Sequence, residues 1–139
     1  MKKIISLTLS LALLLGCMLT LASCGAPKLE GTYSGSYFTE DEDILTITIK
    51  KDKTVEYSLL IASEAAPLTA KGAYTIEKEE DHGHELIKFT VEAGANALLL
   101  MMNNCEYVYS LEKAKGAKTL TLAGHDNDYF DLTLTEVKK

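Results

Sequence analysis

The chain has 139 residues, of which 47% are hydrophobic and 24% are charged. That length supports one cored domain and is too short for two, and the charged fraction excludes a protein with several membrane spans or a typical disordered tail. The formal net charge of −6 argues against nucleic acid as a partner, because a nucleic-acid binder normally carries a basic face.

The chain opens on a short cationic start, Met-Lys-Lys, and residues 4–21 then carry no charge. Residues 21–24 read Leu-Ala-Ser-Cys and resemble the lipobox of bacterial lipoprotein signal peptides, where two small residues precede the cysteine that receives lipid. The resemblance implies a signal peptide at residues 1–23, lipidation of Cys24 and a lipidated tether at residues 24–30. It places the protein on the cell membrane or outer membrane of a bacterium, facing outside the cytoplasm and held by acyl chains.

Two alternatives stay open for this segment. An apolar run of about 20 residues is nearly long enough to be an uncleaved transmembrane anchor. A second box, Leu-Leu-Gly-Cys, ends at Cys17, but its middle leucine fits the small-residue pattern less well. Cleavage before Cys24 leaves 116 residues with a formal charge of −8, because the removed segment contains two lysines and no acid. Cys105 is then the only cysteine beside the lipidated one, so we expect no internal disulfide and a buried thiol.

After the tether, apolar and polar residues alternate in short runs separated by charged or glycine-containing turns. Alternation with a period of two predicts β-strands with one buried face. Eight short strands joined in order can close on themselves and so remove both sheet edges. The sequence therefore predicts a single all-β domain at residues 31–139, an antiparallel up-and-down barrel of about eight strands, with a flattened sandwich as the alternative. The predicted strands are 31–38, 44–51, 54–62, 68–78, 84–93, 105–114, 118–123 and 129–137.

The domain opens on Gly-Thr-Tyr at residues 31–33. With the eight-strand meander, this opening resembles small lipocalin-like bacterial lipoproteins. The lipocalin motif is Gly-x-Trp, and Tyr33 stands where that family has tryptophan; the later arginine of the family has no counterpart, because the chain contains no arginine. The resemblance implies an eight-stranded barrel that binds a small ligand, and it transfers no individual binding residue.

Tyrosine is abundant in the predicted strands. It combines a flat apolar face with a hydrogen-bonding tip, which suits a small amphipathic ligand inside a barrel. The alternative is a solid core, since an eight-stranded interior holds either side chains or one small ligand. The candidate mouth and interior of a ligand site are Phe38, Tyr57, Leu99, Met101, Tyr107 and Tyr109.

Metal and catalytic motifs are weak. His82 and His84 lie in an acidic turn, where their imidazoles could bind a divalent transition metal, although an ordinary solvated hairpin turn has the same composition. Met101, Met102 and Cys105 offer soft ligands for Cu(I), with core packing as the alternative. No Ser-His-Asp arrangement can be assigned, so we expect no enzyme activity and no cofactor.

In a meander, successive turns alternate between the two ends of the barrel. The second, fourth and sixth turns, at 50–53, 78–85 and 113–118, share one end with the tether and the C-terminal lysines, where an anionic bilayer would favour them. The other turns hold no lysine and include the charge-free segment 93–105. We expect this acidic, apolar-lipped end to point away from the membrane as the functional end. Alternatively, residues 98–102 plug the barrel as a packed lid.

Two hypotheses of function follow. The first is a lipid-anchored, non-catalytic binding module for a small apolar or amphipathic ligand. The second is an envelope structural or protein-interaction module with a solid barrel core. An empty apolar cavity would favour the first hypothesis, and a filled interior would favour the second.

Overall fold

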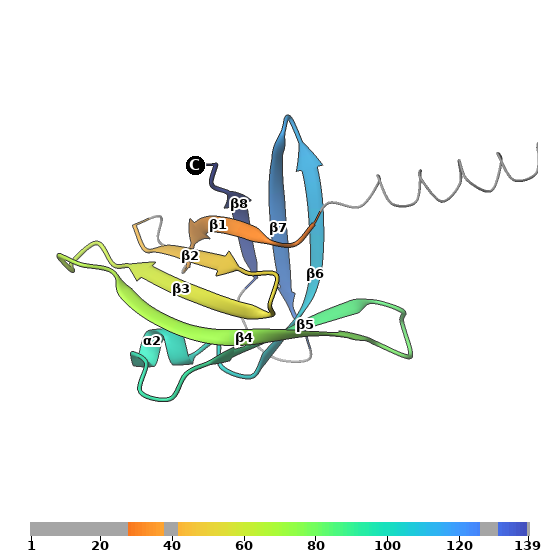
Figure 1. Cartoon of the computed structure of the whole chain (residues 1–139), viewed down its shortest axis with the longest axis horizontal. Helices are drawn as coiled ribbons and strands as arrows, with labels where there is room; N and C mark the ends of the chain where they lie inside the picture. The colour runs from red at the N-terminus through yellow and green to blue at the C-terminus, as the bar shows by residue number, and fades with distance from the viewer. Residues whose placement is uncertain (1–27, 38–41, 126–130, 139) are drawn as a thin grey trace, which may run out of the picture.

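The computed structural model describes residues 28–37, 42–125 and 131–138, and these residues form a closed antiparallel barrel (Figure 1). Its elements are β1 (Gly31–Ser36), β2 (Ile44–Ile49), β3 (Thr54–Leu60), β4 (Leu68–Lys78), β5 (Glu85–Val91), α2 (Ala97–Leu100), β6 (Cys105–Ala114), β7 (Ala117–Gly124) and β8 (Leu132–Glu136). The strands pair in sequence order, and β1 pairs with β8 to close the ring. The predicted up-and-down barrel is confirmed, and a closed eight-stranded ring is consistent with a lipocalin-like fold.

The predicted strands differ from the observed ones mainly at their ends. β4 and β6 have the predicted bounds, and β1, β2 and β3 each end two residues earlier than predicted. β5 and β8 are shorter than predicted at both ends, whereas β7 is one residue longer at each end. An element that the sequence did not predict is α2, a short helix inside the segment predicted as a loop. Cys24 and the apolar run before it lie outside the described residues. Within the residues that the structure does describe, no helix is long and apolar enough to cross a membrane.

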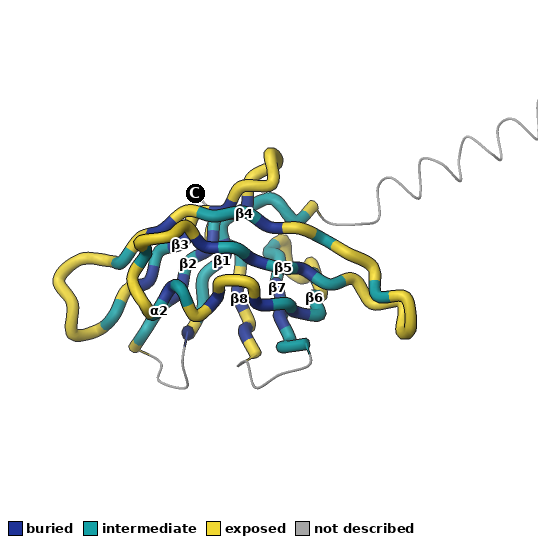
Figure 2. Tube along the Cα trace, turned by 90° about the horizontal axis from the view of Figure 1, so that it is seen from below, coloured by how far each residue is buried: buried dark blue, intermediate teal, exposed yellow. Residues whose placement is uncertain are grey.

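Strict alternation along the strands builds the core. In β2, Leu45, Ile47 and Ile49 are buried, while the residues between them are half-exposed. The same pattern recurs on the other strands, so their apolar rows meet inside one barrel. Figure 2 shows the buried residues following the strands and the exposed ones gathering in the connections. The outward positions of β2 are Thr46 and Thr48, as expected for a pleated surface that water reaches.

The strands are strongly staggered, as closure of a barrel from tilted strands requires. Leu86, next to the first residue of β5, already lies opposite Val108 in the middle of β6, and Val108 lies opposite Ala123 near the end of β7. In Figure 1 the β4–β5 hairpin projects away from the barrel, and its base passes the end of β7. The expectation that the two sets of turns are fully separated is wrong at this point, because the stagger brings His125, at the start of the seventh turn, against Glu79 in the fourth.

Gly72 marks a close approach between β4 and β5. A methyl group there would overlap the carbonyl oxygen of Thr90 and lie 3.1 Å from the ring of Tyr57. The missing side chain lets the Thr90 carbonyl turn toward the interior, where it accepts a hydrogen bond from the Tyr57 hydroxyl at 2.9 Å. Glycine is thus required here by contact with a neighbouring backbone.

Candidate functional site

The α2 end of the barrel is closed by side chains of the segment predicted as mouth or lid. Leu99 and Met102 have no exposed surface. The Asn96 side chain accepts a hydrogen bond from the Leu98 backbone at 3.0 Å and so caps the helix. The Tyr37 hydroxyl donates to the Leu98 carbonyl at 2.7 Å from the opposite side of the barrel. These contacts fit the alternative in which the segment plugs the barrel.

Three of the interior tyrosines are hydrogen-bonded to the barrel's own backbone. Besides Tyr57 and Tyr37, the Tyr33 hydroxyl donates to the Leu29 carbonyl at 2.7 Å. Phe89 packs edge-on between Tyr57 and Tyr107, with ring centroids 6.4 Å and 6.1 Å apart. Burial raises the pKa of Tyr37 and Tyr57, so both hydroxyls keep their protons and act as donors. Aromatic rings and satisfied hydroxyls thus occupy the centre of the barrel.

The candidate ligand residues are therefore spread over different environments. Tyr57, Tyr107 and Leu99 are fully buried, while Met101 is 47% exposed at the α2 end. Tyr109 is half-buried at the other end, where its hydroxyl donates to Glu85 at 2.7 Å. Phe38 lies outside the described residues. The structure does not bring the five described side chains together around one space, and the role of the candidate residues in ligand binding stays a prediction.

Cys105 is buried, as the alternation of β6 predicted. Its thiol donates to the Met101 carbonyl at 2.9 Å, which ties β6 to the end of the plug. Met102 is fully buried, whereas Met101 is exposed, so the methionines face different environments. Core packing explains Met102 and Cys105, and it was the alternative to a Cu(I) site.

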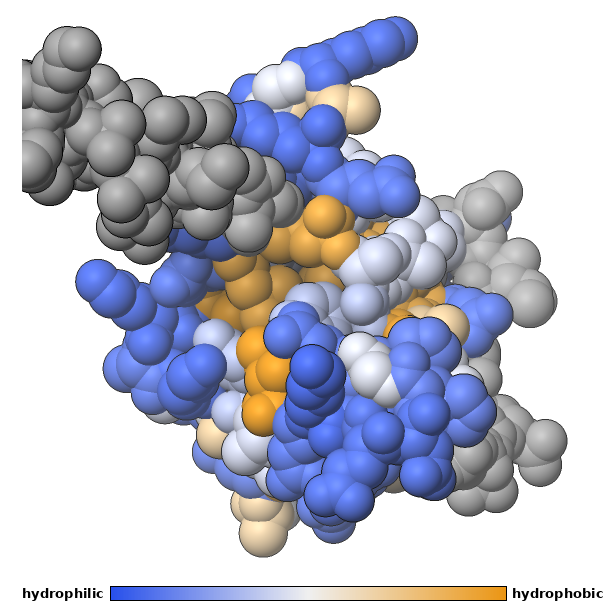
Figure 3. Space-filling model, turned by 90° about the vertical axis from the view of Figure 1, so that its right-hand side faces the viewer, coloured by the Kyte–Doolittle hydropathy of each residue, from blue (hydrophilic) through white to orange (hydrophobic). Residues whose placement is uncertain are grey.

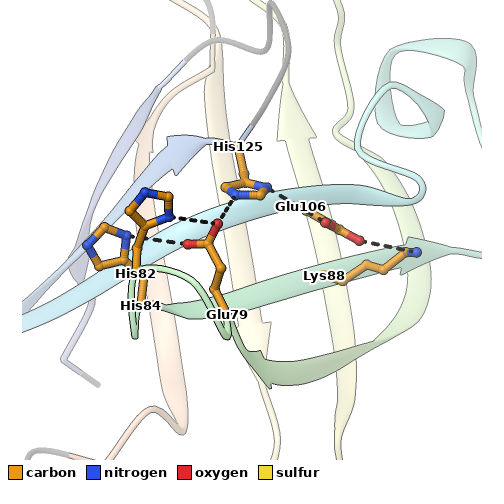
Figure 4. A network of polar contacts seen from close by, with 6 residues as sticks. All are labelled: Glu79, His82, His84, Lys88, Glu106 and His125. Carbon is orange, nitrogen blue, oxygen red and sulfur yellow. Dashed lines mark hydrogen bonds and ion pairs between the residues drawn. The ribbon is translucent and has the colours of Figure 1, made fainter.

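All three histidines of the chain converge on Glu79, at the start of the β4–β5 turn (Figure 4). His125 donates through Nε2 to Glu79 Oε1 at 3.1 Å. His82 Nδ1 lies 3.4 Å from Oε1, and His84 Nδ1 lies 3.6 Å from Oε2. The hydrogen bond from His125 lowers the pKa of Glu79, with a smaller contribution from His82 and against the effect of burial. Glu106 adds a longer contact to His125 at 3.9 Å.

This cluster joins the β4–β5 hairpin to the end of β7. The sequence indicated His82 and His84 as neighbours, but it gave no sign of Glu79 as their shared acceptor or of His125 as a member. In the described part of the chain, no group of three or more His, Cys, Asp or Glu side chains is placed to hold a metal ion. The ring nitrogens face the carboxylate at hydrogen-bond and ion-pair distances. These polar contacts hold the β4–β5 turn against the residue that follows β7.

A groove of about 380 Å³ lies on the outer wall of β2, β3 and β4. Outward side chains of these strands line it, together with Glu92 after β5. Its one ion pair among the described residues joins Glu56 to Lys50, with 2.6 Å between nitrogen and oxygen. Outward-facing threonine and serine hydroxyls account for much of its lining. Its lining includes Thr46, Thr48, Ser58, Thr69 and Lys71.

A second pocket, of about 340 Å³, lies where the chain enters the barrel and where it leaves β8. Four lysines line it, and we call it the lysine pocket: Lys28, Lys113, Lys118 and Lys138, with Gly116 and Glu136. The sequence predicted that these lysines share one end of the barrel. It did not predict that they border one pocket.

Lys118 organises the lysine pocket. Its side chain is 12% exposed and its ammonium group donates to the carbonyls of Lys28 and Glu30 at 2.7 Å and 2.8 Å. Glu136 Oε1 lies 3.3 Å from the same nitrogen, and the ring centroid of Tyr33 lies 5.5 Å from it. Burial alone would lower the pKa of Lys118, but the Tyr33 hydroxyl and Glu136 outweigh that effect and raise it. Lys118 therefore stays charged and fastens the entering chain to the barrel.

No protein-family model, no curated protein and no solved structure matches this chain. A proposal about its function therefore rests on the fold, the plug, the histidine cluster and the two outer pockets alone.

Proposed function

We propose that this protein is a lipid-anchored, extracytoplasmic interaction module without catalysis, with a solid barrel core. The observation that carries the proposal is the occupied interior: Tyr57, Phe89 and Tyr107 pack on one another, and Leu99 and Met102 close the end. A barrel filled by its own side chains presents its outer surface to a partner. This favours the second hypothesis of function over an interior site for a small ligand.

The contact end proposed for the partner is the one that carries α2. Leu60, at the end of β3, and Met101, after α2, are exposed at 46% and 47%. Leu60 lies opposite Ile44, whereas Gly31 lies opposite Ile49, so Leu60 and the entering chain are at opposite ends of the barrel. A lipid at Cys24 then holds the entering end at the membrane and turns Leu60 and Met101 outward. Two of the three large hydrophobic side chains exposed in the described residues thus lie at the far end, the third being Val137 after β8, and this arrangement suits contact of the far end with an envelope protein.

The anchor is tested by replacing Cys24 with alanine. We expect loss of metabolic labelling with a fatty acid, because only a thiol at this position can take the diacylglyceryl group. Cys17→Ala is the matched control and should leave the labelling unchanged, because Cys17 belongs to the segment that is removed. Undiminished labelling of the Cys24→Ala protein would contradict the anchor, and loss of labelling in Cys17→Ala alone would move it to the second box.

The solid core is tested by native mass spectrometry of the lipidated protein purified from its source. We expect the mass of the acylated polypeptide with no retained small molecule. The reason is that the interior tyrosine hydroxyls already bond to the carbonyls of Leu29, Leu98 and Thr90. A stoichiometric additional mass that survives gentle ionisation and disappears on unfolding would contradict the proposal and restore ligand binding as the function.

A further inference from the structure

We propose that the lysine pocket binds the phosphate groups of anionic lipids, so that the barrel rests on the bilayer at the corner from which its tether leaves. This inference rests on the proposed lipid anchor at Cys24, and it names the surface of the domain that meets the membrane. Three features of the pocket carry it: its distance from the anchor, its charge and the way its lysines are held.

The pocket lies close to the anchored residue because the chain is fastened there. Lys118 binds the carbonyls of Lys28 and Glu30, the Tyr33 hydroxyl binds that of Leu29, and the Leu29 side chain packs against the core. The tether therefore leaves from a fixed point at Lys28. Cys24 is four residues upstream, and an extended chain of that length spans at most about 14 Å. A lipid on Cys24 consequently holds the pocket next to the headgroups.

The pocket is positive on a protein that is acidic overall. Glu136 is its one acidic lining residue, and the carboxylate is committed to the ammonium group of Lys118 at 3.3 Å and to its backbone N–H at 3.2 Å. Burial raises the pKa of Glu136, but the hydrogen bonds from Lys118 and the charges of Lys118 and Lys138 lower it, so the carboxylate stays charged. Lys28, Lys113 and Lys138 remain as exposed ammonium groups without an ion pair among the described residues. Each lysine near an anionic bilayer increases the affinity for that surface about fivefold.

The β6–β7 hairpin holds like charges together. Lys113 lies directly opposite Lys118, so both side chains leave the same face of the hairpin. Like charges in that position repel, and an anion between them relieves the repulsion. The turn itself is tight, since Lys115 and Gly116 both have positive φ, and a methyl group at Gly116 would lie 3.2 Å from Lys138 Nζ. Lysines from the hairpin and the C-terminal segment thus converge at a rigid turn.

The same end of the barrel carries apolar side chains that are only partly buried. Half-buried hydrophobic side chains at this end are Leu29, before β1, Ile76, near the end of β4, and Leu111, near the end of β6. Figure 3 looks onto this side of the molecule and shows a hydrophobic area between hydrophilic projections. Apolar residues bordered by lysines are the arrangement by which a domain lies on the interface of an anionic membrane.

The experiment compares the labelling of individual lysines in the full lipidated protein on two kinds of vesicle. The protein is reconstituted on phosphatidylglycerol or phosphatidylcholine vesicles and treated with an amine-reactive reagent, and the rate at each lysine is read by mass spectrometry. We expect Lys28, Lys113 and Lys138 to react about fivefold more slowly on phosphatidylglycerol. Lys71 and Lys88, on β4 and β5, should react at equal rates on both.

Two double variants test whether the pocket acts as one site. In Lys113→Gln/Lys138→Gln, the protection of Lys28 on phosphatidylglycerol should fall to less than about twofold, because one remaining charge cannot hold the headgroup. The matched control Lys71→Gln/Lys88→Gln makes the same change in net charge and should keep the full protection. Lys118 is left intact in both variants because it fastens residues 28–30.

The outcomes separate this proposal from the anchor on which it rests. Failure of the wild-type protein to float with either vesicle contradicts the lipid anchor. Flotation with both, but equal labelling rates, overturns the role of the lysine pocket and leaves the anchor standing. Equal protection by inorganic phosphate without vesicles overturns the membrane as occupant and assigns the pocket to a free anion. Unchanged protection of Lys28 in the Lys113→Gln/Lys138→Gln variant also overturns the proposal.

Discussion

Replacing Gly72 with alanine is expected to lower the free energy of unfolding by about 3 kcal/mol or more. The added methyl group would overlap the Thr90 carbonyl and press on the Tyr57 ring. To relieve that overlap, β5 must move away from β4, which breaks the hydrogen bond from Tyr57 to Thr90. Without the overlap, alanine in a strand would stabilise the protein by about 0.5–1 kcal/mol relative to glycine. The energetic cost of the overlap must therefore exceed this gain. Urea unfolding should show a lower midpoint with an unchanged slope.

Gly83→Ala is the matched control for this prediction. A methyl group at Gly83 meets no atom within 4 Å, so the change costs only the strain of a positive φ of 70°. That strain is worth about 1–2 kcal/mol. The two variants make the same chemical change, and only Gly72 adds the clash with a neighbouring strand. Equal loss of stability in both would show that β5 can move aside without cost and that the close approach is not a constraint.

The strands and the closed barrel could be predicted because both follow from local pattern. Apolar residues at every second position, as in Leu45, Ile47 and Ile49, fix which face of a strand is buried. Most of the connections are too short for a crossover, so consecutive strands pair. Even the special place of Gly72 has a local trace, since it falls in the inward row between Ala70 and Tyr74. The sequence pattern cannot show how close the backbone of β5 comes to Gly72.

The plug and the histidine cluster could not be predicted, because each depends on strand stagger and on contacts between distant segments. Residues 97–100 read Ala-Leu-Leu-Leu, which fits a strand, a lid or a helix equally well. The helix α2 is favoured by contacts with distant residues at the end of the barrel, among them the hydrogen bond from Tyr37 to the Leu98 carbonyl. Glu79 and His125 are 46 residues apart and meet only because the barrel is staggered. His82 and His84 had a sequence signal in their spacing, whereas Glu79 was one acid among several in the same turn.

The lysine pocket could be predicted only in part. The alternation of turns in a meander placed 113–118, the tether and the C-terminal lysines at one end, and the structure has Lys28, Lys113, Lys118 and Lys138 together there. The sequence could not reveal that Lys118 turns inward while the others stay exposed. That difference comes from the carbonyls of Lys28 and Glu30, which need a donor where the chain enters the barrel.

Replacing Leu99 with alanine is expected to lower the free energy of unfolding by about 2–5 kcal/mol, and Met101→Ala should change it by less than about 0.5 kcal/mol. Leu99 is fully buried in the core, whereas Met101, two residues away, is 47% exposed. The truncation removes a plug side chain and leaves a cavity among apolar neighbours, which stays dry and can admit a small hydrophobic molecule. We therefore expect a small apolar dye to bind folded Leu99→Ala and not the wild-type protein.

The two hypotheses of function give opposite results in this experiment. If the segment were a mobile lid over a ligand site, Leu99 would leave the core easily, its truncation would cost less than about 1 kcal/mol, and the wild-type protein would already bind the dye. If Leu99 is a plug, the stability loss and the new dye binding appear together in one variant. Met101→Ala then isolates the outer surface: it should leave stability intact and weaken contact with an envelope partner, because its side chain lies outside the plug that Leu99 completes.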